Sequence, residues 1–557
     1  GEGTTTDNNT VNINGTTVTD KIIGGTAADG TGNTLNVVGM NNSAGSVENF
    51  QNMNFDATGA VKNSTLLTVT GGAATKVDWT KLTATGTAEK PLTLLKNDSG
   101  IDLAGYTGTA KSETTDTTET NVDVRKNNDG KVTEITYEGY QFAGVTAPVI
   151  SGTDVYGGIS RAGNATHANA ITVNDDYTNV YGGHTSGMST TAVEKKNSHD
   201  NTVTIAGGTL GNVYGGYTAA ADGTTNNNTV TLAGGTVTGT VSGGNRTADG
   251  NTLNVNTAAR VGKVENFEKV AFKDAASKLT LTDTGTFNLN TLEAGFDATA
   301  DEATLVESAN ALTLAGGNVF KSELNTDGTK ETNLDVRDGN RRIVRYAYTF
   351  KGATAATTVG SDTWGGRSVA GNTTTGNSVT VGGGTHTNVY GGWTTGAGST
   401  ATDKGDSISN NVTVSGSATV SGTVYGGFTD VANGKATRNA VTVDKTIAGA
   451  VVGGKALGEA SGNIVTVKAN TGAVTGGDGA TTNNNTVNLE GASVNGTITG
   501  GTQAMGTSNM LNVKGQNAAR NIGGFQRVNF DATGVAAGTT MLNLNGSAGT
   551  TLDRGAI

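Results

Sequence analysis

The sequence predicts an all-β fold in which short coils of about 24 residues stack on one another as a β-solenoid. Three observations predict it. A Gly-Gly pair and an asparagine-led strand recur along the chain, the strands alternate apolar and polar residues, and no stretch shows helical periodicity. Repeat periods of roughly 20 to 50 residues are typical of solenoids. One such repeat cannot bury its own apolar face, so it has to stack on the next.

The Gly-Gly pairs form two runs. Their first glycines are 25, 33 and 28 residues apart in the first run, and 26, 35, 27, 23 and 24 apart in the second. The longest steps contain the polar insertions 185–200 and 394–409, and a solenoid tolerates such insertions and whole added coils. The first glycines are Gly157, Gly182, Gly215, Gly243, Gly365, Gly391, Gly426, Gly453, Gly476 and Gly500.

An asparagine precedes an alternating strand in many coils, as in "NTVTI" from Asn201 and "NTVTL" from Asn228. Val203 and Ile205 point to one side of their strand, and the intervening threonines point to the other. We therefore expect Val, Ile and Leu to fill the lumen and Thr to face water. Asparagine tolerates tight turns, and at a repeated position it is expected to stack into a hydrogen-bond ladder.

A Tyr-Gly-Gly motif also recurs, and we interpret it as a corner of each coil. Glycine there would let the chain bend sharply and let the coils approach closely. The tyrosine rings are expected to stack above one another, and a ligand-binding loop is the alternative interpretation. The corner residues are Tyr156, Gly157, Gly158, Tyr181, Gly182, Gly183, Tyr214, Gly215, Gly216, Tyr390, Gly391, Gly392, Tyr425, Gly426 and Gly427.

A larger repeat is built from these coils. The segments 33–59, 251–275 and 509–534 each contain an asparagine-led strand followed by two spaced phenylalanines. We interpret residues 1–557 as one continuous β-solenoid. Its parts are an opening coil region (1–32), a first large repeat (33–250, with Tyr-Gly-Gly coils over about 150–250), a second (251–508, with coils over about 360–508) and the start of a third (509–557).

Each large repeat contains one hairpin signal, in 111–144 and again in 321–352. In the first copy, "TNVDVR" and "VTEITYEGY" flank "KNNDGK"; in the second, "TNLDVR" and "RIVRYAYTF" flank "DGNR". A strand, an Asn/Asp-Gly turn and a second strand indicate a β-hairpin. We expect two hairpins, standing off the solenoid.

Composition narrows the classes of function. The 557 residues include 86 Gly, 2 Pro and no Cys, with 15% charged and 5% aromatic residues. The net charge of −11 disfavours a nucleic-acid partner, and no apolar run reaches the roughly 18 residues of a membrane-spanning helix. Without cysteine the sequence offers no thiolate metal site or cysteine nucleophile. We expect no metal and no cofactor.

Candidate catalytic groups are few. Asp175 and Asp176 form the best carboxylate pair, which a glycoside-cleaving enzyme would use as acid and base. His199 and Asp200 form the best His–Asp pair. We interpret both pairs as solvated loop residues, because the acidic residues are scattered along the chain. The protein is therefore expected not to be an enzyme, with a polysaccharide-degrading β-helix enzyme as the alternative.

The segment "NNNTVTLAGGTVTGTVSGG" (226–244), the "NVYGG" coils and the pattern "NTLNV…VENF…VAF" together resemble passenger domains of bacterial autotransporter adhesins, which use type V secretion. The resemblance covers nearly the whole chain. It implies a right-handed parallel β-helix on the bacterial cell surface, acting in virulence as an adhesin or fibre. In that family a barrel, which this sequence does not contain, attaches the passenger to the outer membrane.

The resemblance also indicates what kind of partner to expect. A host or neighbouring-cell surface receptor, either protein or glycan, is implied, or a second copy of the chain. A self-assembling extracellular filament subunit is a further alternative. The motifs are repeat motifs, so no binding residue of the family is carried over to this sequence.

The two ends of the sequence carry ordinary repeats. Residues 1–25 contain "NNTVNI" and a Gly-Gly pair without a signal-peptide pattern, and the third large repeat runs only 49 residues, to Ile557. The open end of a solenoid exposes lumen side chains and strand edges. We therefore expect an excerpt from a longer array, or a subunit whose ends are covered by identical neighbours.

Overall fold

The structure is a computed structural model that describes residues 1–27, 30–86, 91–187, 196–246, 249–396, 405–503, 506–547 and 557. In these ranges the regular elements are β-strands, apart from one 3-10 turn, η1 (Trp79–Lys81), and no helix is long and apolar enough to cross a membrane. The chain divides into two compact units, 1–296 with 306–317 and 297–305 with 318–557. The predicted all-β, parallel-strand class is confirmed, and the hand of the coil stays a prediction.

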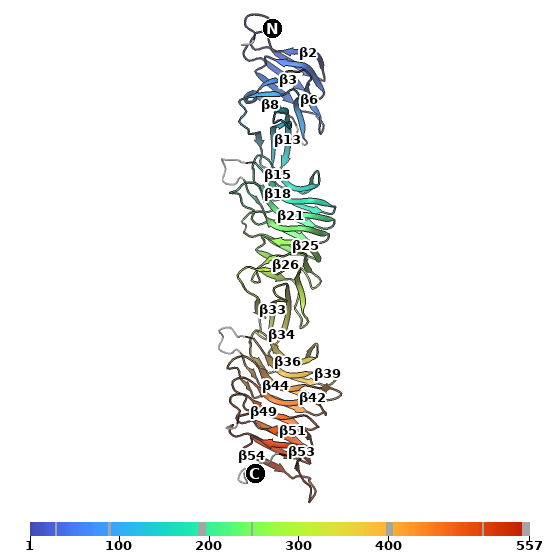
Figure 1. The fold of residues 1–557 in the computed structure, drawn as a ribbon, viewed down its shortest axis with the longest axis vertical. Coiled ribbons are helices and arrows are strands. Elements are labelled where there is room, and N and C mark those ends of the chain that lie inside the picture. Colours follow the sequence, from blue (N-terminus) through green and yellow to red (C-terminus); the bar gives the residue numbers. More distant parts are fainter. Residues whose placement is uncertain are drawn as a thin grey trace. The chain divides into compact units, whose positions relative to one another are not determined.

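The first part of the first unit has two faces of parallel strands (Figure 1). Successive coils add one strand to each face, and Thr10 pairs with Thr34, which in turn pairs with Asn52. One face is β1 (Thr10–Asn14), β3 (Thr34–Val38), β5 (Asn52–Asp56) and β8 (Leu82–Thr85). The other is β2 (Thr17–Ile23), β4 (Asn42–Glu48), β6 (Thr65–Val69) and β9 (Leu92–Asn97).

The Tyr-Gly-Gly run of the first unit repeats this arrangement with longer sheets. Neighbouring strands are parallel and in register, so Val203 pairs with Val230, and Val230 with Leu253. The Tyr-Gly-Gly sheet contains β15 (Asp154–Ser160), β18 (Tyr177–Thr185), β21 (Thr209–Thr218), β23 (Thr236–Gly244), β25 (Ala258–Glu265) and β27 (Lys278–Leu281). The asparagine-led sheet contains β17 (Ala170–Val173), β20 (Thr202–Ile205), β22 (Thr229–Leu232), β24 (Thr252–Val255) and β26 (Lys269–Phe272).

The second unit has the same two kinds of sheet. Its Tyr-Gly-Gly sheet contains β36 (Asp362–Ser368), β40 (Asn388–Thr394), β44 (Thr423–Thr429), β47 (Ala450–Lys455), β49 (Val474–Asp478), β51 (Ser493–Thr499) and β53 (Asn517–Gly523). Its asparagine-led sheet contains β38 (Ser378–Val381), β42 (Asn411–Val414), β46 (Ala440–Val443), β48 (Ile464–Val467), β50 (Thr486–Glu490), β52 (Met510–Lys514) and β54 (Arg527–Asp531). Each coil therefore contributes one strand to each sheet.

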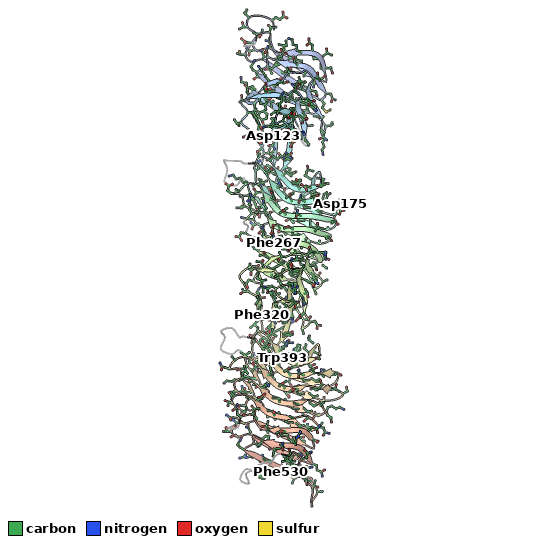
Figure 2. All side chains as sticks on the ribbon, viewed as in Figure 1. Asp123, Asp175, Phe267, Phe320, Trp393 and Phe530 are labelled. Atoms are coloured by element: carbon green, nitrogen blue, oxygen red, sulfur yellow. The ribbon has the colours of Figure 1, made fainter. Side chains whose placement is uncertain are left out.

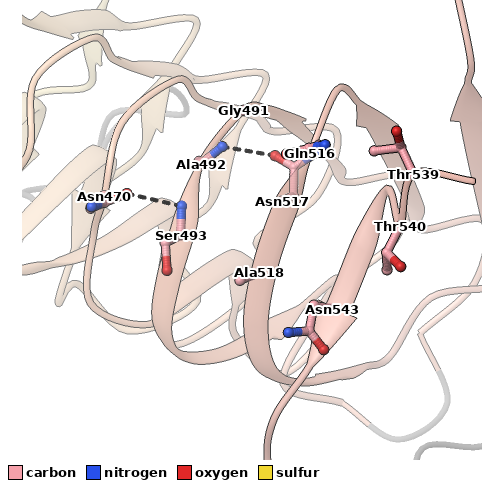
Figure 3. Close-up of a pocket in the computed structure, with 10 residues that line it drawn as sticks. All are labelled: Asn470, Gly491, Ala492, Ser493, Gln516, Asn517, Ala518, Thr539, Thr540 and Asn543. Atoms are coloured by element: carbon pink, nitrogen blue, oxygen red, sulfur yellow. Dashed lines mark hydrogen bonds between the residues drawn. The ribbon is translucent and has the colours of Figure 1, made fainter. Parts of the chain in front are cut away.

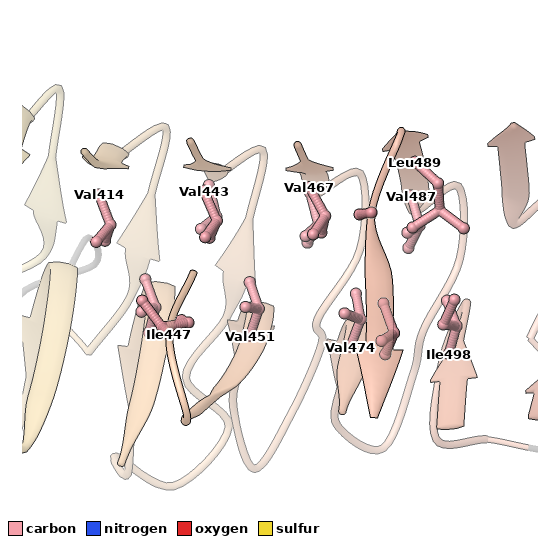
Figure 4. Packing of buried hydrophobic residues seen from close by; sticks show 14 of the residues in the cluster. Val414, Val443, Ile447, Val451, Val467, Val474, Val487, Leu489 and Ile498 are labelled. Atoms are coloured by element: carbon pink, nitrogen blue, oxygen red, sulfur yellow. The ribbon is translucent and has the colours of Figure 1, made fainter. Parts of the chain in front are cut away.

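Ladders of apolar side chains fill the lumen between the two sheets (Figure 4). Val414, Val443 and Val467 lie in register on the asparagine-led sheet, and all three are fully buried. Val451 and Val474 face them from the Tyr-Gly-Gly sheet. The lumen positions inferred from period-2 alternation are buried, which confirms that interpretation of the sequence.

Both predicted hairpins form, each as part of a three-stranded antiparallel meander. The first meander is β11 (Lys111–Thr114), β12 (Thr118–Lys126) and β13 (Val132–Gln141); the second is β32 (Phe320–Leu324), β33 (Lys330–Arg337) and β34 (Arg342–Thr349). The expectation that the hairpins stand off the coils is wrong for the first, because β13 also pairs antiparallel with β9. That pairing satisfies the open edge of β9, so the meander continues the stacked sheet.

We predict that damage to a lumen position stays local. Val203 is fully buried, so Val203→Asp places an unpaired charge in a dry lumen, at a cost of several kcal/mol. Because stability in stacked repeats is nearly a sum over neighbours, hydrogen exchange should speed up in that coil and the coils beside it. Thr204→Asp, on the half-buried outer side of the same strand, is the control. Equal loss of protection throughout the chain would contradict the prediction.

Candidate interaction surface

The Tyr-Gly-Gly motifs lie inside strands, in β15, β18, β21, β40 and β44, and not in turns. None of their ten glycines has a positive φ. Pairing between coils joins tyrosine to tyrosine, or Trp364 to Tyr390 in one case. It joins second glycine to second glycine and omits the first glycine. The inward alternation therefore shifts by one residue, since Val180 and Thr185, five positions apart, are both fully buried. The motif marks a change of phase within a strand.

Close packing is the reason why glycine is needed there. A Cβ on Gly182 would lie 2.9 Å from Cγ2 of Val203 and would also overlap the carbonyl oxygen of Gly215. A Cβ on Gly183 would lie 2.7 Å from the side-chain nitrogen of Asn201. The same overlaps recur at the glycine pairs of the second unit. The Tyr-Gly-Gly strand thus lies against the asparagine that leads the opposite strand, and any side chain would separate them.

The predicted asparagine ladder is confirmed. Asn169 Nδ2 donates to Asn201 Oδ1 at 2.8 Å, and Asn201 Nδ2 donates to Asn228 Oδ1 at 3.0 Å. Each of these three is at most 1% exposed, so the ladder satisfies amides that water does not reach. A ladder with steps of 2.7 to 3.3 Å runs through the second unit, along Asn377, Asn410, Asn439, Asn463, Asn485 and Asn509.

At each place where the next coil has no such asparagine, a longer side chain replaces it as the hydrogen-bond acceptor. Its side-chain oxygen accepts the backbone N–H of the last asparagine, at 2.9, 2.7 and 2.8 Å in the three cases. Burial raises the pKa of the one carboxylic acid among them. Each follows the first phenylalanine of the large repeat directly, a position to which the sequence comparison assigned no role. The three acceptors are Gln51, Glu268 and Gln526.

The tyrosines of the motif stack on the outer side, as predicted, in a separate stack in each unit. Tyr156 and Tyr181 have ring centroids 5.1 Å apart and planes 13° apart, and Tyr181 and Tyr214 are 5.4 Å and 9° apart. Tyr390 and Tyr425 are 5.1 Å and 10° apart. Burial raises the pKa of Tyr156 and of Tyr214. The stacks present ring edges on the outer face of each Tyr-Gly-Gly sheet.

A second aromatic column stands beside the first, at the residue that follows each glycine pair. His184 and Tyr217 stack at 4.8 Å, and both meet Tyr181 edge to face, at 4.9 and 5.4 Å. Burial lowers the pKa of His184. Edge-to-face pairs are worth roughly 0.5–1.5 kcal/mol each beyond the area they bury. In the second unit, Trp393 and Phe428 occupy these positions.

The outer face of the second unit carries an arginine–tryptophan cluster, defined as Tyr348, Trp364, Arg367 and Trp393. Arg367 and Trp393 belong to the second column, Trp364 stands at the tyrosine position and Tyr348 lies on β34. The guanidinium carbon of Arg367 lies 4.1 Å from the ring centroid of Trp393, 4.5 Å from that of Trp364 and 4.6 Å from that of Tyr348. Arg367 Nε and Trp393 Nε1 are buried and have no acceptor among the described residues. A buried donor left without a partner costs about 1–3 kcal/mol.

A buried glutamate joins each meander to the Tyr-Gly-Gly run that follows it. Glu119, on β12, is 1% exposed and accepts from Ser160 Oγ at 2.6 Å, from the backbone N–H of Arg161 at 2.6 Å and from Asn164 Nδ2 at 2.7 Å. Glu331, on β33, makes the equivalent bonds to Ser368, Val369 and Asn372 at 2.6 to 2.8 Å. We call these two sites the glutamate clamps.

Sequence reasoning missed the glutamate clamps, although the sequence carries a signal for them. "ETN" occurs in both hairpin segments, at 119–121 and 331–333. "SRAGN" (160–164) and "SVAGN" (368–372) supply the serine and the asparagine. Because the partners lie 41 and 37 residues from the glutamate, only their joint repetition in the two copies points to a contact.

The candidate catalytic residues have ordinary surroundings. Asp175 and Asp176 are both exposed, and Asp176 accepts the backbone N–H of Thr209 at 2.7 Å (Figure 2). His199, in β19 (Ser198–His199), stacks on His167 at 5.4 Å, and its Nδ1 lies 2.7 Å from Asp200. Part of the neighbouring insertion, 188–195, lies outside the described residues, as does 397–404 in the second insertion. That these pairs are not catalytic stays a prediction.

An open polar pocket lies between coils of the second unit (Figure 3). Two of its amides are engaged in the coil itself, since Asn517 accepts the backbone N–H of Ala492 at 2.8 Å and Asn470 accepts that of Ser493 at 3.1 Å. No group of three or more His, Cys, Asp or Glu side chains that could hold a metal occurs in the part of the chain that the structure describes. The outer aromatic columns are therefore the more distinctive surface.

Comparisons with protein-family models, with curated proteins and with solved structures give no match. The geometry itself defines a stacked-coil β-protein whose outer face repeats from coil to coil.

We predict that Glu119→Gln loosens the first glutamate clamp. A glutamine places an N–H₂ among donors that point at the carboxylate, so at least one buried donor loses its acceptor, at about 1–3 kcal/mol. Hydrogen exchange should speed up in 160–164 and leave the distant coils unchanged. Glu113→Gln, on the exposed face of β11, is the matched control. Unchanged protection of 160–164 would show that the carboxylate is dispensable.

We predict that alkali weakens the tyrosine stack of the first unit. Burial raises the folded-state pKa of Tyr156 and Tyr214, so the folded state favours the neutral phenol. Their contribution is present below the ordinary pKa of about 10 and is lost as pH rises through the raised folded value. Phenolate absorbance should rise together with loss of near-ultraviolet dichroism. In Tyr156→Phe and Tyr214→Phe variants that dichroism should persist to higher pH; an identical alkaline transition would contradict the assignment.

Proposed function

We propose that the protein is an extracellular, cell-surface β-helix that acts as an adhesive or structural stalk, of the autotransporter adhesin class. In this proposal the coils are right-handed, and the loops and outer columns meet a receptor on a host or neighbouring cell, or a second copy of the chain. The protein is proposed not to be an enzyme. The resemblance of its repeats to passenger domains motivates the class, and the geometry supports the role.

One observation carries the proposal: identical outer positions recur on successive coils at nearly constant spacing. The tyrosine rings repeat at 5.1 and 5.4 Å in the first unit, on a scaffold whose asparagine amides are bonded internally. A repeated row of side chains lets a partner make the same contact several times, and multivalent contact raises avidity without new kinds of interaction. Aromatic side chains are also the type that most often dominates binding energy.

The experiment coats beads with the purified chain and measures two outcomes, attachment of the beads to epithelial or bacterial cells and clumping of the beads with one another. Attachment or clumping above albumin-coated beads is expected. The same preparation is incubated with neutral and acidic polysaccharides. If the beads bind nothing and the polysaccharides are cut, the protein is an enzyme and the proposal fails. Inert beads with intact polysaccharides would also overturn the adhesive role.

A further inference from the structure

Arg367 is a cation on the outer face of an acidic protein, held among aromatic rings. Among the described residues no carboxylate lies within ion-pair distance of it, although the net charge is −11. The carboxylates that act on its cluster are already engaged. Glu331 is held in its clamp, Asp362 accepts from Asn388 Nδ2 at 3.1 Å, and Glu302 is paired with Arg337. Among the described residues of the unit, these contacts leave Arg367 without a neutralising carboxylate.

The unpaired hydrogen-bond donors of the cluster also indicate a ligand from outside the coil. Arg367 Nε and Trp393 Nε1 are buried donors without an acceptor in the described ranges. The two terminal nitrogens of Arg367 are not buried, unpaired donors of this kind. Since no hydrogen bond of Arg367 occurs within the described residues, those terminal nitrogens reach solvent. Unsatisfied buried donors in a native protein call for an explanation such as a bound water or ligand. One of the two, Arg367 Nε, belongs to the guanidinium, whose terminal nitrogens are the part of the cluster that a ligand outside the coil can reach.

The equivalent positions of the first unit show that the scaffold does not require this cluster. Ile159 and His184 stand there at the positions of Arg367 and Trp393, in the same register. Arg161, two residues after Ile159, is already paired with Glu138 at 3.5 Å and lies 5.1 Å from the ring of Tyr140. The pairing register is the same in both runs, so the coil does not require an arginine or a tryptophan at these positions.

We propose that the arginine–tryptophan cluster binds a sugar that bears a single carboxylate, such as a terminal sialate or uronate. The terminal nitrogens of Arg367 hold the carboxylate in a fork. The sugar C–H groups lie against the half-buried ring of Trp393, while Trp364, which is 1% exposed, supports Arg367 from inside. This inference rests on the proposed adhesive function, for which it names the partner class.

Charge and size select this ligand class. A densely charged polyanion would be repelled by a chain of net charge −11, whereas one carboxylate needs only the one local cation. A second protein would need about 800 Å² of surface on each partner for a stable interface. The cluster comprises four side chains, with the ring faces of Trp364 and Trp393 already covered by Arg367. It is therefore sized for a sugar residue.

The test uses the full chain and tryptophan fluorescence. Of the three tryptophans, Trp364 and Trp393 belong to the cluster, and Trp79→Phe removes the background of the third. Sialyllactose, and separately a glucuronate-terminated disaccharide, should change the fluorescence saturably, and the stronger of the two identifies the source. Lactose should not. Binding should weaken as salt is raised, because the contact is charged and partly exposed.

Variants measured by calorimetry separate the contributions. Arg367→Gln should weaken binding by about tenfold or more, because a hydrogen bond to a charged group is lost. Arg367→Lys keeps the charge and should retain part of the affinity. Trp393→Phe keeps a ring but offers less surface to the sugar and to Arg367, and a loss of about threefold is expected. Arg527→Gln, an exposed arginine on β54, is the matched control and should change nothing.

Four results would overturn the proposal: equal binding of lactose, unchanged affinity in a folded Arg367→Gln variant, tighter Arg367-dependent binding of heparin, and an Arg367-dependent change of oligomeric state without binding of either acidic sugar. The last would assign the cluster to contact between copies. Coated beads that adhere while neither sugar binds would overturn this inference and leave the proposed function standing. If the acidic sugars bind but the coated beads never adhere, the proposed function is overturned and the sugar site stands.

Discussion

A buried amide has to find hydrogen-bond partners, and in this protein the next coil supplies them. The side chain of Asn201 is enclosed between two sheets, where water does not reach. Its Nδ2 donates to Ser198 and Asn228, and its Oδ1 accepts from Asn169. This fixes the axial register of each coil on its neighbour, because a slip of one residue would leave the amide unpaired and turn the lumen valines outward. The ladder thus sets the register of the sheets, of the lumen side chains and of the outer face.

The glycine pair is a consequence of that ladder. The amide occupies the space next to the opposite strand, so that strand can carry no side chain where it passes, and Gly183 lies where a Cβ would overlap Asn201. The resulting phase shift turns the next residue, His184, to the outer face directly beside Tyr181. Two aromatic columns therefore exist because an amide ladder exists inside the coil. The hydrogen bonding of the buried amides thus determines where aromatic rings can stand on the outer surface.

The extent to which sequence predicted this architecture follows from the range of each interaction. Strand alternation at Val203, the recurrence of Asn201 and Asn228 and the tyrosine stacks are local patterns repeated many times, so a single sequence carries them. The placement of the glycine pair inside a strand was missed, because a repeated Gly-Gly looks like a turn until its neighbour across the lumen is known. The glutamate clamps and the contact of Arg367 with Trp393 depend on residues one or more coils away. A local sequence pattern does not show that such residues are in contact.

The two Tyr-Gly-Gly runs show which positions are fixed by stacking and which are free to differ. The asparagine and the glycine pair are the same in both, since each is enclosed by its neighbours. The tyrosine column and the column after the glycine pair differ, with Tyr156, Ile159 and His184 in one run and Trp364, Arg367 and Trp393 in the other. Ser242 and Thr475 occupy the tyrosine position in later coils, so the chemistry of this column can change without loss of the coil. Differences in binding between the runs should therefore arise in these two columns, while the ladder inside holds them at the same spacing.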